Sequence, residues 1–312
     1  MNLPALTADW PGRDSESLVW LASYPRSGNT FTRILLANYL ASDGDAYDLN
    51  LLQDFIPSDT NENLWESAGI PPIRPDDWEG VWKARPTVFA HYRKTKGRQA
   101  LSCLKTHSAN IITFGAGGFD FRENDRALYI VRHPLDVLIS LADFNGRDIE
   151  STIDVMTCSG FAVRKDGSGR MEVRGSWGEH VASWISSAPC PLLLVRYEEL
   201  AAETERTLRD ILSFLGIPIV ERRVQQALAL SRFDKLREQE AEGSFIESHA
   251  DTTSGRFFRE GKSLQWLGKL SPEQASRLAD ACEKIMTPLG YTHPREVLFG
   301  GSKAVGDPCL HP

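Results

Sequence analysis

A short polar segment, residues 24–30, has the composition and setting of an anion-binding loop. It reads Tyr-Pro-Arg-Ser-Gly-Asn-Thr and follows a short apolar run at 18–22. From residue 30 to residue 40 the apolar residues recur at helical spacing. A loop between a strand and a helix presents unpaired backbone N–H groups and the positive end of the helix dipole. The segment therefore predicts a site for a phosphate or sulfate group.

The side chains of this loop favour the same interpretation. Arg26 supplies a permanent planar cation, Ser27 and Thr30 supply hydroxyl groups, and Gly28 allows a ligand to approach the backbone. The alternative is an ordinary turn with a surface arginine. The loop is not an ATP loop of the Walker type, because no glycine lies five residues before Gly28 and no lysine follows it.

A second candidate for chemistry follows another apolar run, at 100–105. Lys105 and His107 lie at its end, separated by one residue. A histidine can take up and release a proton near neutral pH, and a lysine can stabilise negative charge on a leaving oxygen. His107 is thus the candidate general base. His91 and His133 lack such a context, and we expect both to be structural.

The elements that must position these residues form an alternating pattern. Further apolar runs at 127–132 and 192–195 predict two more strands, and helical patterns follow them. Alternation of this kind predicts an α/β fold of three layers, with a central parallel sheet flanked by helices. Loop 24–30, Lys105 with His107, Arg132 and Tyr197 all follow strand ends. They should therefore meet at one edge of the sheet.

Together these segments resemble the sulfotransferases that use 3′-phosphoadenosine 5′-phosphosulfate (PAPS). The phosphosulfate loop of that family commonly reads Tyr-Pro-Lys-Ser-Gly-Thr-Thr, and its catalytic histidine lies in a Lys-Thr-His segment, which recurs here at 105–107. The resemblance covers about residues 18–290. It implies a P-loop-like fold, His107 as catalytic base, and Lys105 and Arg26 at the transferred group. Because Arg26 replaces the family lysine, it cannot serve as a proton donor.

The resemblance also implies which residues hold the donor and its product PAP. Arg132 and Ser140 match the family's Arg–Ser pair at the 3′-phosphate, and Asp136 between them is a cap or a local ion pair. Glu260 stands where the family has lysine, and Lys262 can compensate. Core packing is the alternative role for the phenylalanines. The full implied set is Arg26, Ser27, Gly28, Asn29, Thr30, Phe31, Arg132, Ser140, Tyr197, Ser231, Phe233, Phe258, Arg259, Glu260 and Gly261.

Composition narrows the possible partners and the compartment. The net charge of −7 argues against general binding of nucleic acids. Five scattered cysteines without a C-x-x-C pair favour reduced thiols in a cytoplasm, and no metal is expected. We expect no signal peptide and no membrane span. The predicted organisation is a loose lead-in at 1–17, a single domain at 18–298 and a flexible tail at 299–312.

The acceptor is not readable from these motifs. Its walls should be loops at 43–96, 146–177 and 238–254. We expect 43–82 to form either a lid or wall on the acceptor side or a packed irregular insertion. We expect 146–174 to be irregular, with a turn at 166–169. The expected acceptor is a hydroxyl of a small molecule or glycoconjugate, with a bacterial natural product favoured. Two rivals are a small-molecule kinase using Mg²⁺ and ATP, and a nucleotide-binding protein without catalysis. A homo-oligomer is possible, and the oligomeric state stays open.

Overall fold

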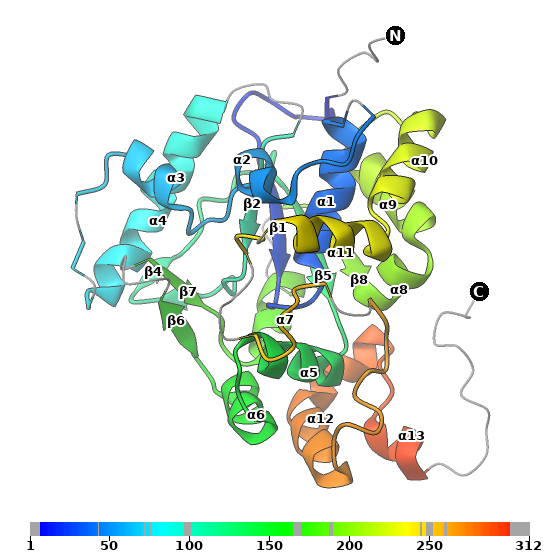
Figure 1. Cartoon of the computed structure of the whole chain (residues 1–312). Coiled ribbons are helices and arrows are strands. Elements are labelled where there is room, and N and C mark those ends of the chain that lie inside the picture. Colours follow the sequence, from blue (N-terminus) through cyan, green and yellow to red (C-terminus); the bar gives the residue numbers. More distant parts are fainter. Residues whose placement is uncertain are drawn as a thin grey trace.

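A parallel four-stranded sheet forms the centre of the protein (Figure 1). This computed structural model describes residues 7–42, 44–71, 73–74, 76–96, 101–164, 170–186, 190–243, 245–247, 252–258 and 261–299. The strand order is β2-β1-β5-β8, with neighbouring strands parallel. The strands are β1 (Val19–Ser23), β2 (Cys103–Thr106), β5 (Arg126–Val131) and β8 (Leu192–Arg196). Because all four run in the same direction, the loops that follow them gather at one edge.

Helices cover both faces of this sheet, as the sequence predicted. Successive strand residues face opposite sides, so that Trp20 and Tyr129 join one apolar cluster while Leu21 and Ile130 join the other. The first face carries α3 (Glu62–Ser67), α4 (Trp78–Lys96), α5 (Pro134–Phe144), α6 (Ile149–Thr157), α7 (Trp177–Ile185) and α12 (Pro272–Met286). The second carries α1 (Asn29–Leu40), α2 (Leu52–Phe55), α8 (Tyr197–Ala202), α9 (Thr204–Phe214), α10 (Glu221–Leu230) and α11 (Phe233–Glu242). The three-layer α/β fold is confirmed.

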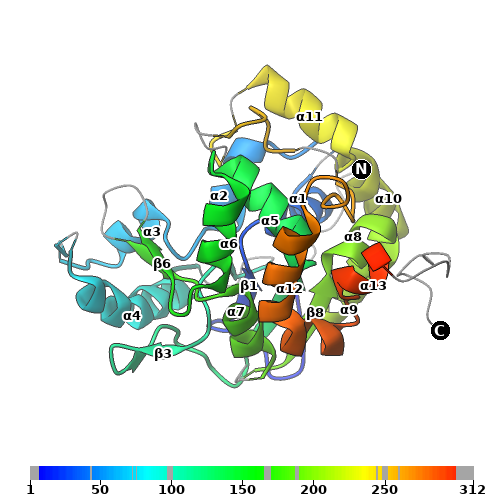
Figure 2. The same ribbon diagram turned by 90° about the horizontal axis from the view of Figure 1, so that it is seen from below.

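Smaller elements complete the described part of the chain. They are η1 (Leu49–Leu51), η2 (Thr287–Leu289), α13 (Pro294–Phe299) and two antiparallel hairpins, β3 (Ile112–Thr113) with β4 (Ala116–Gly117) and β6 (Ala162–Arg164) with β7 (Met171–Val173). Figure 2 shows α6, α12 and α5 grouped beside one another.

The segment 146–174 corrects the sequence prediction. We expected it to be irregular, but it contains α6 and the β6–β7 hairpin. Asp148 begins α6, because its side chain accepts a hydrogen bond from the N–H of Ser151. Ile153 and Met156 on one face of α6 are buried in the core. The predicted turn at 166–169 lies outside the described residues, and its flanking strands pair through Ala162 and Val173.

The segment 43–82 forms short helices and then enters a long one. Trp65 and Trp82 are buried, so part of the segment is packed rather than a free lid. The 19-residue helix α4 was not predicted, although its buried residues recur at helical spacing. Pro86 lies inside it, and two of the buried positions are arginines. A proline and charged residues on the buried face both conceal a helical pattern.

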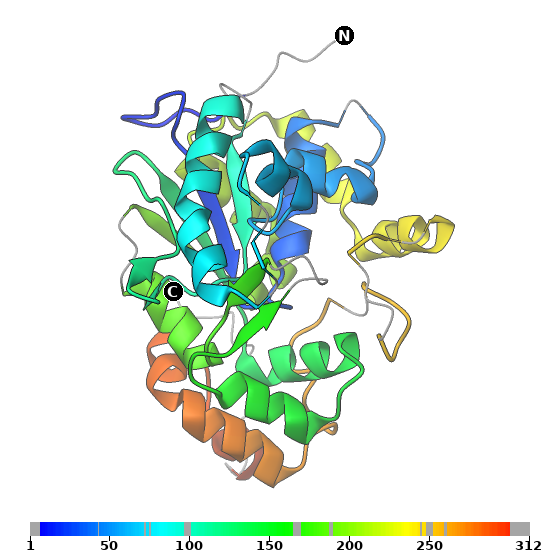
Figure 3. The same ribbon diagram turned by 90° about the vertical axis from the view of Figure 1, so that its left-hand side faces the viewer.

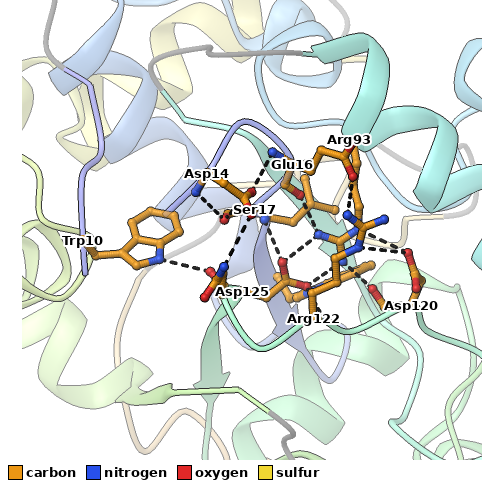
Figure 4. A network of polar contacts seen from close by, with 11 residues as sticks. Trp10, Asp14, Glu16, Ser17, Arg93, Asp120, Arg122 and Asp125 are labelled. Carbon is orange, nitrogen blue, oxygen red and sulfur yellow. Dashed lines mark hydrogen bonds and ion pairs between the residues drawn. The ribbon is translucent and has the colours of Figure 1, made fainter. Parts of the chain in front are cut away.

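The buried arginines of α4 are held by carboxylates from distant segments. Arg93 forms two hydrogen bonds of 2.6 Å with the carboxylate of Asp125, which also accepts from the N–H of Leu18 and the indole of Trp20 (Figure 4). Arg85 donates to Asp59 at 2.6 Å. The Arg93 network fastens α4 to the N-terminal ends of β1 and β5, opposite the edge where the strand-end loops gather.

The expected loose lead-in is packed where the structure describes it, at 7–17. Trp10 is buried and donates its indole N–H to the carbonyl of Asn124 (Figure 4). The N–H of Asp9 donates to the carbonyl of Gly216. At the other end, α13 reaches Phe299, and the expected tail beyond it lies outside the described residues. Among the described helices, none is long and apolar enough to cross a membrane.

Candidate active site

A cavity of about 620 Å³ lies at the edge of the sheet where the strands end. Its lining combines loop residues after β1, β2, β5 and β8 with residues of α5, α6, α11 and the β6–β7 hairpin. Sequence candidates that line it are Arg26, Gly28, Asn29, Thr30, Phe31, Lys105, His107, Arg132, Ser140, Tyr197, Phe233, Phe258 and Gly261. Residues far apart in the sequence thus meet in one concave site, as pockets of this fold class do.

The loop before α1 has the backbone geometry of an anion cradle. Gly28 adopts a φ of 105°, which L side chains rarely adopt, and a Cβ there would lie 2.5 Å from Cδ2 of Tyr197. Arg26 also has a positive φ of 67°. The helix begins at Asn29 without a side-chain cap. The first N–H groups of α1 are therefore left for a ligand.

Ser27 is buried, and the side-chain amide of Asn29 points to β1. Among the described residues, the buried Ser27 hydroxyl has no hydrogen-bond partner. Asn29 donates from its side-chain amide to the carbonyl of Leu21, 3.1 Å away, and so joins the loop to β1. The backbone groups of Ser27 and Asn29 remain candidates for ligand contact, whereas the Asn29 side chain has a structural role.

Arg26 extends across the cavity to the opposite wall. Its Nε donates to the Ser140 hydroxyl at 3.0 Å and its Nη2 to the carbonyl of Phe257 at 3.2 Å. The guanidinium lies 4.5 Å and 4.4 Å from the ring centroids of Phe144 and Phe257. Flat cations are well suited to such a slot between two rings. The loop is thereby connected to the predicted 3′-phosphate residue Ser140.

His107 has a defined tautomer. Its Nδ1 lies 2.8 Å from the backbone carbonyl oxygen of Ser23. Because a carbonyl oxygen only accepts, Nδ1 must carry the proton, and Nε2 is left with its lone pair. Burial, followed by the positive charge of Lys105, holds the pKa of His107 well below its usual value. The imidazole is therefore neutral at pH 7, in the form that a general base requires.

A carboxylate that the sequence did not single out lies beside the anion loop. Glu247 accepts hydrogen bonds of 2.6 Å from Arg33 and from Gln53, and one of 3.4 Å from the Thr30 hydroxyl. Although burial acts to raise it, the charges of Arg33 and Lys105 and the hydrogen bonds lower the pKa of Glu247 to about 2. The ionised Glu247 thus interacts with Thr30 and Lys105, two residues that are also predicted to contact the phosphosulfate.

Arg132 is held by two backbone carbonyls and an aromatic ring. It donates to the carbonyls of Arg26 and Lys262 at 3.1 Å and 3.2 Å, and its guanidinium lies 4.2 Å from the Tyr197 ring centroid. Asp136, predicted as a cap or a local ion pair, lies in the first turn of α5 and is influenced by the charge of Arg132. Its carboxylate accepts from the N–H groups of Leu264 and Trp266 and thereby anchors the segment after Gly261.

The aromatic candidates divide between the cavity and the core. The rings of Phe31 and Phe233 stack 5.3 Å apart, and a Cβ on Gly261 would lie 2.4 Å from Phe233. An adenine placed between these rings would require them to separate. Phe258 is 4% exposed and stacks on Phe245, so its ring belongs mainly to the core. These contacts leave both base stacking and packing available to Phe31 and Phe233.

Three other candidates have different outcomes. The Ser231 hydroxyl accepts a hydrogen bond from the Asn38 side chain at 2.9 Å, and Ser231 is not among the cavity-lining residues. Arg259 and Glu260 lie outside the described residues. His133 is structural, as expected: its imidazole accepts from the N–H of Leu135 at the start of α5.

Several lining residues escaped the sequence analysis. Phe257 could have been found, because it precedes Phe258 in the segment that resembles the family's Phe-x-Arg-Lys-Gly loop. Phe144 and Glu247 carry no local signal, since their contacts to Arg26 and Thr30 join positions far apart in the sequence. Gln53 likewise contacts Glu247, 194 residues away. Within the described part of the chain, no group of three or more His, Cys, Asp or Glu side chains could hold a metal ion.

Comparison with known proteins identifies the family. The family model for the sulfotransferase domain matches residues 16–290 of this chain. The chain belongs to the sulfotransferase family. A match of that length includes loop 24–30, Lys105 with His107, Arg132 and Ser140.

Individual relatives are distant. Cytosolic sulfotransferase 14 of Arabidopsis thaliana is 28% identical over 298 residues, which are 88% of this chain and 76% of that protein. A 3-alpha-hydroxysteroid sulfotransferase of Cavia porcellus is 28% identical over 53% of this chain, and the match spans 56% of that relative. This sulfotransferase therefore spans about half the length of several curated relatives that it matches, the steroid sulfotransferases among them.

Solved structures with the same fold contain the desulfonated nucleotide. Mouse sulfotransferase SULT7A1 complexed with PAP superimposes with a TM-score of 0.55 at 17% identity, covering 88% of this chain and 86% of that one. Retinol dehydratase in complex with androsterone and inactive cofactor PAP gives 0.59 at 14% identity, covering 91% and 84%. These likenesses establish the fold of the sulfotransferase domain.

Proposed function

We propose that this sulfotransferase moves a sulfuryl group from PAPS to a hydroxyl of a small molecule or glycoconjugate and releases PAP. The observation that carries the proposal is the neutral His107 beside Lys105, in the same cavity as the anion loop before α1. Membership of the family and the PAP bound in solved structures of the same fold support the donor.

In this proposal His107 acts as the general base. The acceptor oxygen forms a bond to sulfur while the bond between sulfur and the bridging phosphate oxygen breaks. The acceptor proton passes to Nε2 of His107, because Nδ1 already donates to the carbonyl of Ser23. The hydrogen bond to Ser23 also fixes the ring orientation, so that the base does not need to reorganise during the transfer.

Positive charge in the cavity would stabilise the leaving oxygen. Lys105 and Arg26 are the nearest candidates, together with the first N–H groups of α1. Arg132 and Ser140 line the same cavity and would hold the 3′-phosphate. Since Arg26 now hydrogen-bonds Ser140, donor binding would exchange that contact for contacts to phosphate oxygens. No step requires a metal ion.

Replacement of the base tests this role. We expect His107→Ala to lower kcat by about 10²- to 10⁴-fold, the usual contribution of a general base. Its affinity for PAP should change little, because the product carries no transferred group. His91→Ala is the matched control, since His91 lies in α4 and is not among the cavity-lining residues. Near-normal turnover by His107→Ala would exclude His107 as the base.

Nucleotide binding tests the donor class. We expect calorimetry in EDTA to show tight binding of PAP and much weaker binding of AMP and ADP, because only PAP carries the 3′-phosphate that Arg132 and Ser140 would hold. Arg132→Ala should abolish that preference. Equal binding of PAP and AMP would refute the 3′-phosphate site, and a requirement for Mg²⁺ would favour a kinase.

A cytoplasmic location is part of the proposal. The plant relative is named as cytosolic, and the four cysteines that the structure describes carry free thiols. Cell fractionation with an antibody against the chain tests it. A bacterial natural product or glycoconjugate as the acceptor has support only from the resemblance of loop 24–30 to bacterial sequences.

A further inference from the structure

The charge of the cavity is unusual for an acidic protein. The whole chain has a net charge of −7, yet seven of the described lining residues are Arg or Lys and one, Glu247, is acidic. Three of the cations, Arg26, Lys105 and Arg132, belong to the proposed donor site. The other four come from one stretch of chain, between α5 and α7: Arg147, Arg164, Arg170 and Arg174.

These four arginines form one part of the cavity wall. Arg147 follows α5, Arg164 ends β6, and Arg170 and Arg174 flank β7. In Figure 1 the β6–β7 hairpin and α6 lie at the same end of the molecule as α5. Figure 3 shows the hairpin in front of the sheet, between α4 and the group formed by α5 and α6. Among the proposed donor residues, Arg26 lies before α1, Arg132 follows β5 and Ser140 lies in α5.

Two of the four already have acidic neighbours. Arg174 forms hydrogen bonds of 2.9 Å and 2.5 Å with the buried carboxylate of Glu172. Arg170 donates to Glu62 at 3.3 Å, although the Glu62 side chain is 63% exposed. The Glu172–Arg174 pair also influences His107, because both charges act on the pKa of the imidazole. This pair stabilises the wall close to the base.

Arg147 and Arg164 have no carboxylate partner within the described residues. Arg164 is instead held by Trp78, with its guanidinium 4.5 Å from the ring centroid. Stacking of this kind orients the flat group while leaving its N–H donors available. The remaining wall is mixed, with Ser58, Thr60 and Asn61 as hydrogen-bonding groups and Phe161 and Val163 as apolar surface.

We propose that the acceptor is a hydroxyl compound that also carries an anionic group, a carboxylate, sulfate or phosphate, which Arg147 and Arg164 bind while the hydroxyl faces His107. This inference rests on the proposed function and names its substrate class. It departs from the neutral steroid and retinol that appear in the names of similar proteins. A neutral apolar acceptor would leave two arginines in the cavity without compensation for lost hydration.

Matched acceptor pairs test the proposal. The probes are 4-hydroxyphenylacetate with 4-hydroxyphenylacetamide, lithocholate with its amide, and glucuronate with glucose, each assayed for PAP release from PAPS. We expect kcat/KM to favour the charged member by about 10- to 100-fold, the size of one or two charge-assisted hydrogen bonds. Calorimetry with the PAP-saturated enzyme measures the same preference in binding. No preference for the charged member in either measurement overturns the proposal.

Variants connect the preference to the residues. Arg164→Gln and Arg147→Gln should each reduce the charged-to-neutral ratio by about 10-fold while PAP affinity stays unchanged. Arg164→Lys should restore part of the ratio. Arg206→Gln is the control, because Arg206 lies in α9 with a side chain 73% exposed. Equal loss for charged and neutral members would mean that Arg164 is only structural and would refute its role.

The experiment separates this inference from the proposed function. Charge-selective binding without any PAP release would reject sulfuryl transfer to these acceptors and retain the anion-binding wall. PAP release with neutral acceptors at least as fast as with charged ones would retain sulfuryl transfer and reject the anionic acceptor.

Discussion

Glu247 gives the sharpest prediction about donor binding. Its carboxylate lies within hydrogen-bond range of the Thr30 hydroxyl, in the loop proposed to hold the phosphosulfate, and Lys105 acts on the same charge. The Thr30 hydroxyl lies 3.4 Å from this carboxylate, so a phosphate oxygen that it bound at about 2.7 Å would lie about 5 Å from the carboxylate oxygen. Two like charges at that distance repel by about 3 kcal/mol at an effective dielectric constant of about 20. Donor binding must therefore displace Glu247 or tolerate this repulsion.

We predict that Glu247→Gln binds PAP more tightly than the wild type. Removal of the charge should recover about 1–3 kcal/mol, which corresponds to a Kd about 5- to 150-fold lower. The same substitution should reduce the free energy of unfolding. The pKa of Glu247 lies at about 2 instead of 4.5, which corresponds to about 3 kcal/mol of stabilisation of the ionised form. In addition, Arg33, whose side chain is fully buried, loses its counter-ion.

Calorimetric titration of PAP and urea denaturation together check both effects. Glu238→Gln is the matched control, because Glu238 lies on the exposed surface of α11 and pairs with Lys235. It should change neither quantity by more than a few tenths of a kcal/mol. A folded Glu247→Gln variant whose Kd for PAP equals or exceeds that of the wild type would refute the competition between Glu247 and the donor.

Three further predictions follow from the structure. Gly28→Ala should reduce stability by about 1–3 kcal/mol and weaken PAP binding, because Gly28 has a φ of 105° and the added methyl group would collide with Tyr197. Gly268→Ala is the control: Gly268 has a φ of 72° but open space around it, so this variant should lose stability alone. Equal PAP affinity in the two variants would contradict the predicted collision with Tyr197. Activity should stay constant from pH 8 to pH 6.5 and fall only at lower pH. Lys105→Met should shift this fall in activity to higher pH, because Lys105 lowers the pKa of His107. A fall at the same pH in both proteins would show that burial alone sets the pKa of His107. Burial also lowers the pKa of His180 to about 3. As the pH falls below 6.5, the unfolded chain therefore takes up a proton at His180 while the folded protein does not, and the free energy of unfolding decreases. Between pH 7.5 and 5.5 His180 should account for about 1.4 kcal/mol of that loss, and His180→Gln should lose correspondingly less in urea denaturation; an identical pH dependence would contradict the assignment.

Local patterns in the sequence were enough for the sheet and the donor side. The apolar runs at 18–22 and 127–132 predicted β1 and β5, because strands buried on both faces are continuously apolar. The alternation with helices placed the residues after each strand at one edge, and there Arg26, His107 and Arg132 line one cavity. Such predictions succeed because strand and helix signals are carried by neighbouring residues.

Helices whose buried face contains charge were harder to predict. In α4 the positions of Arg85 and Arg93 belong to the core, but only through Asp59 and Asp125, which lie 26 and 32 residues away. A local pattern reads such arginines as exposed. The helix α6 was missed for a related reason, since its apolar face is short and becomes evident only against α5 and α12.

What the sequence alone determined is which segments meet in the cavity: loop 24–30, Lys105 with His107, and Arg132 with Ser140, each carried by a contiguous segment with its own motif. What only the tertiary structure decided is which charges face one another across the cavity. Glu247 meets Thr30 across 217 residues, and Arg26 meets Ser140 across 114. No periodicity or motif encodes these pairs, because electrostatic interactions depend on distance in space.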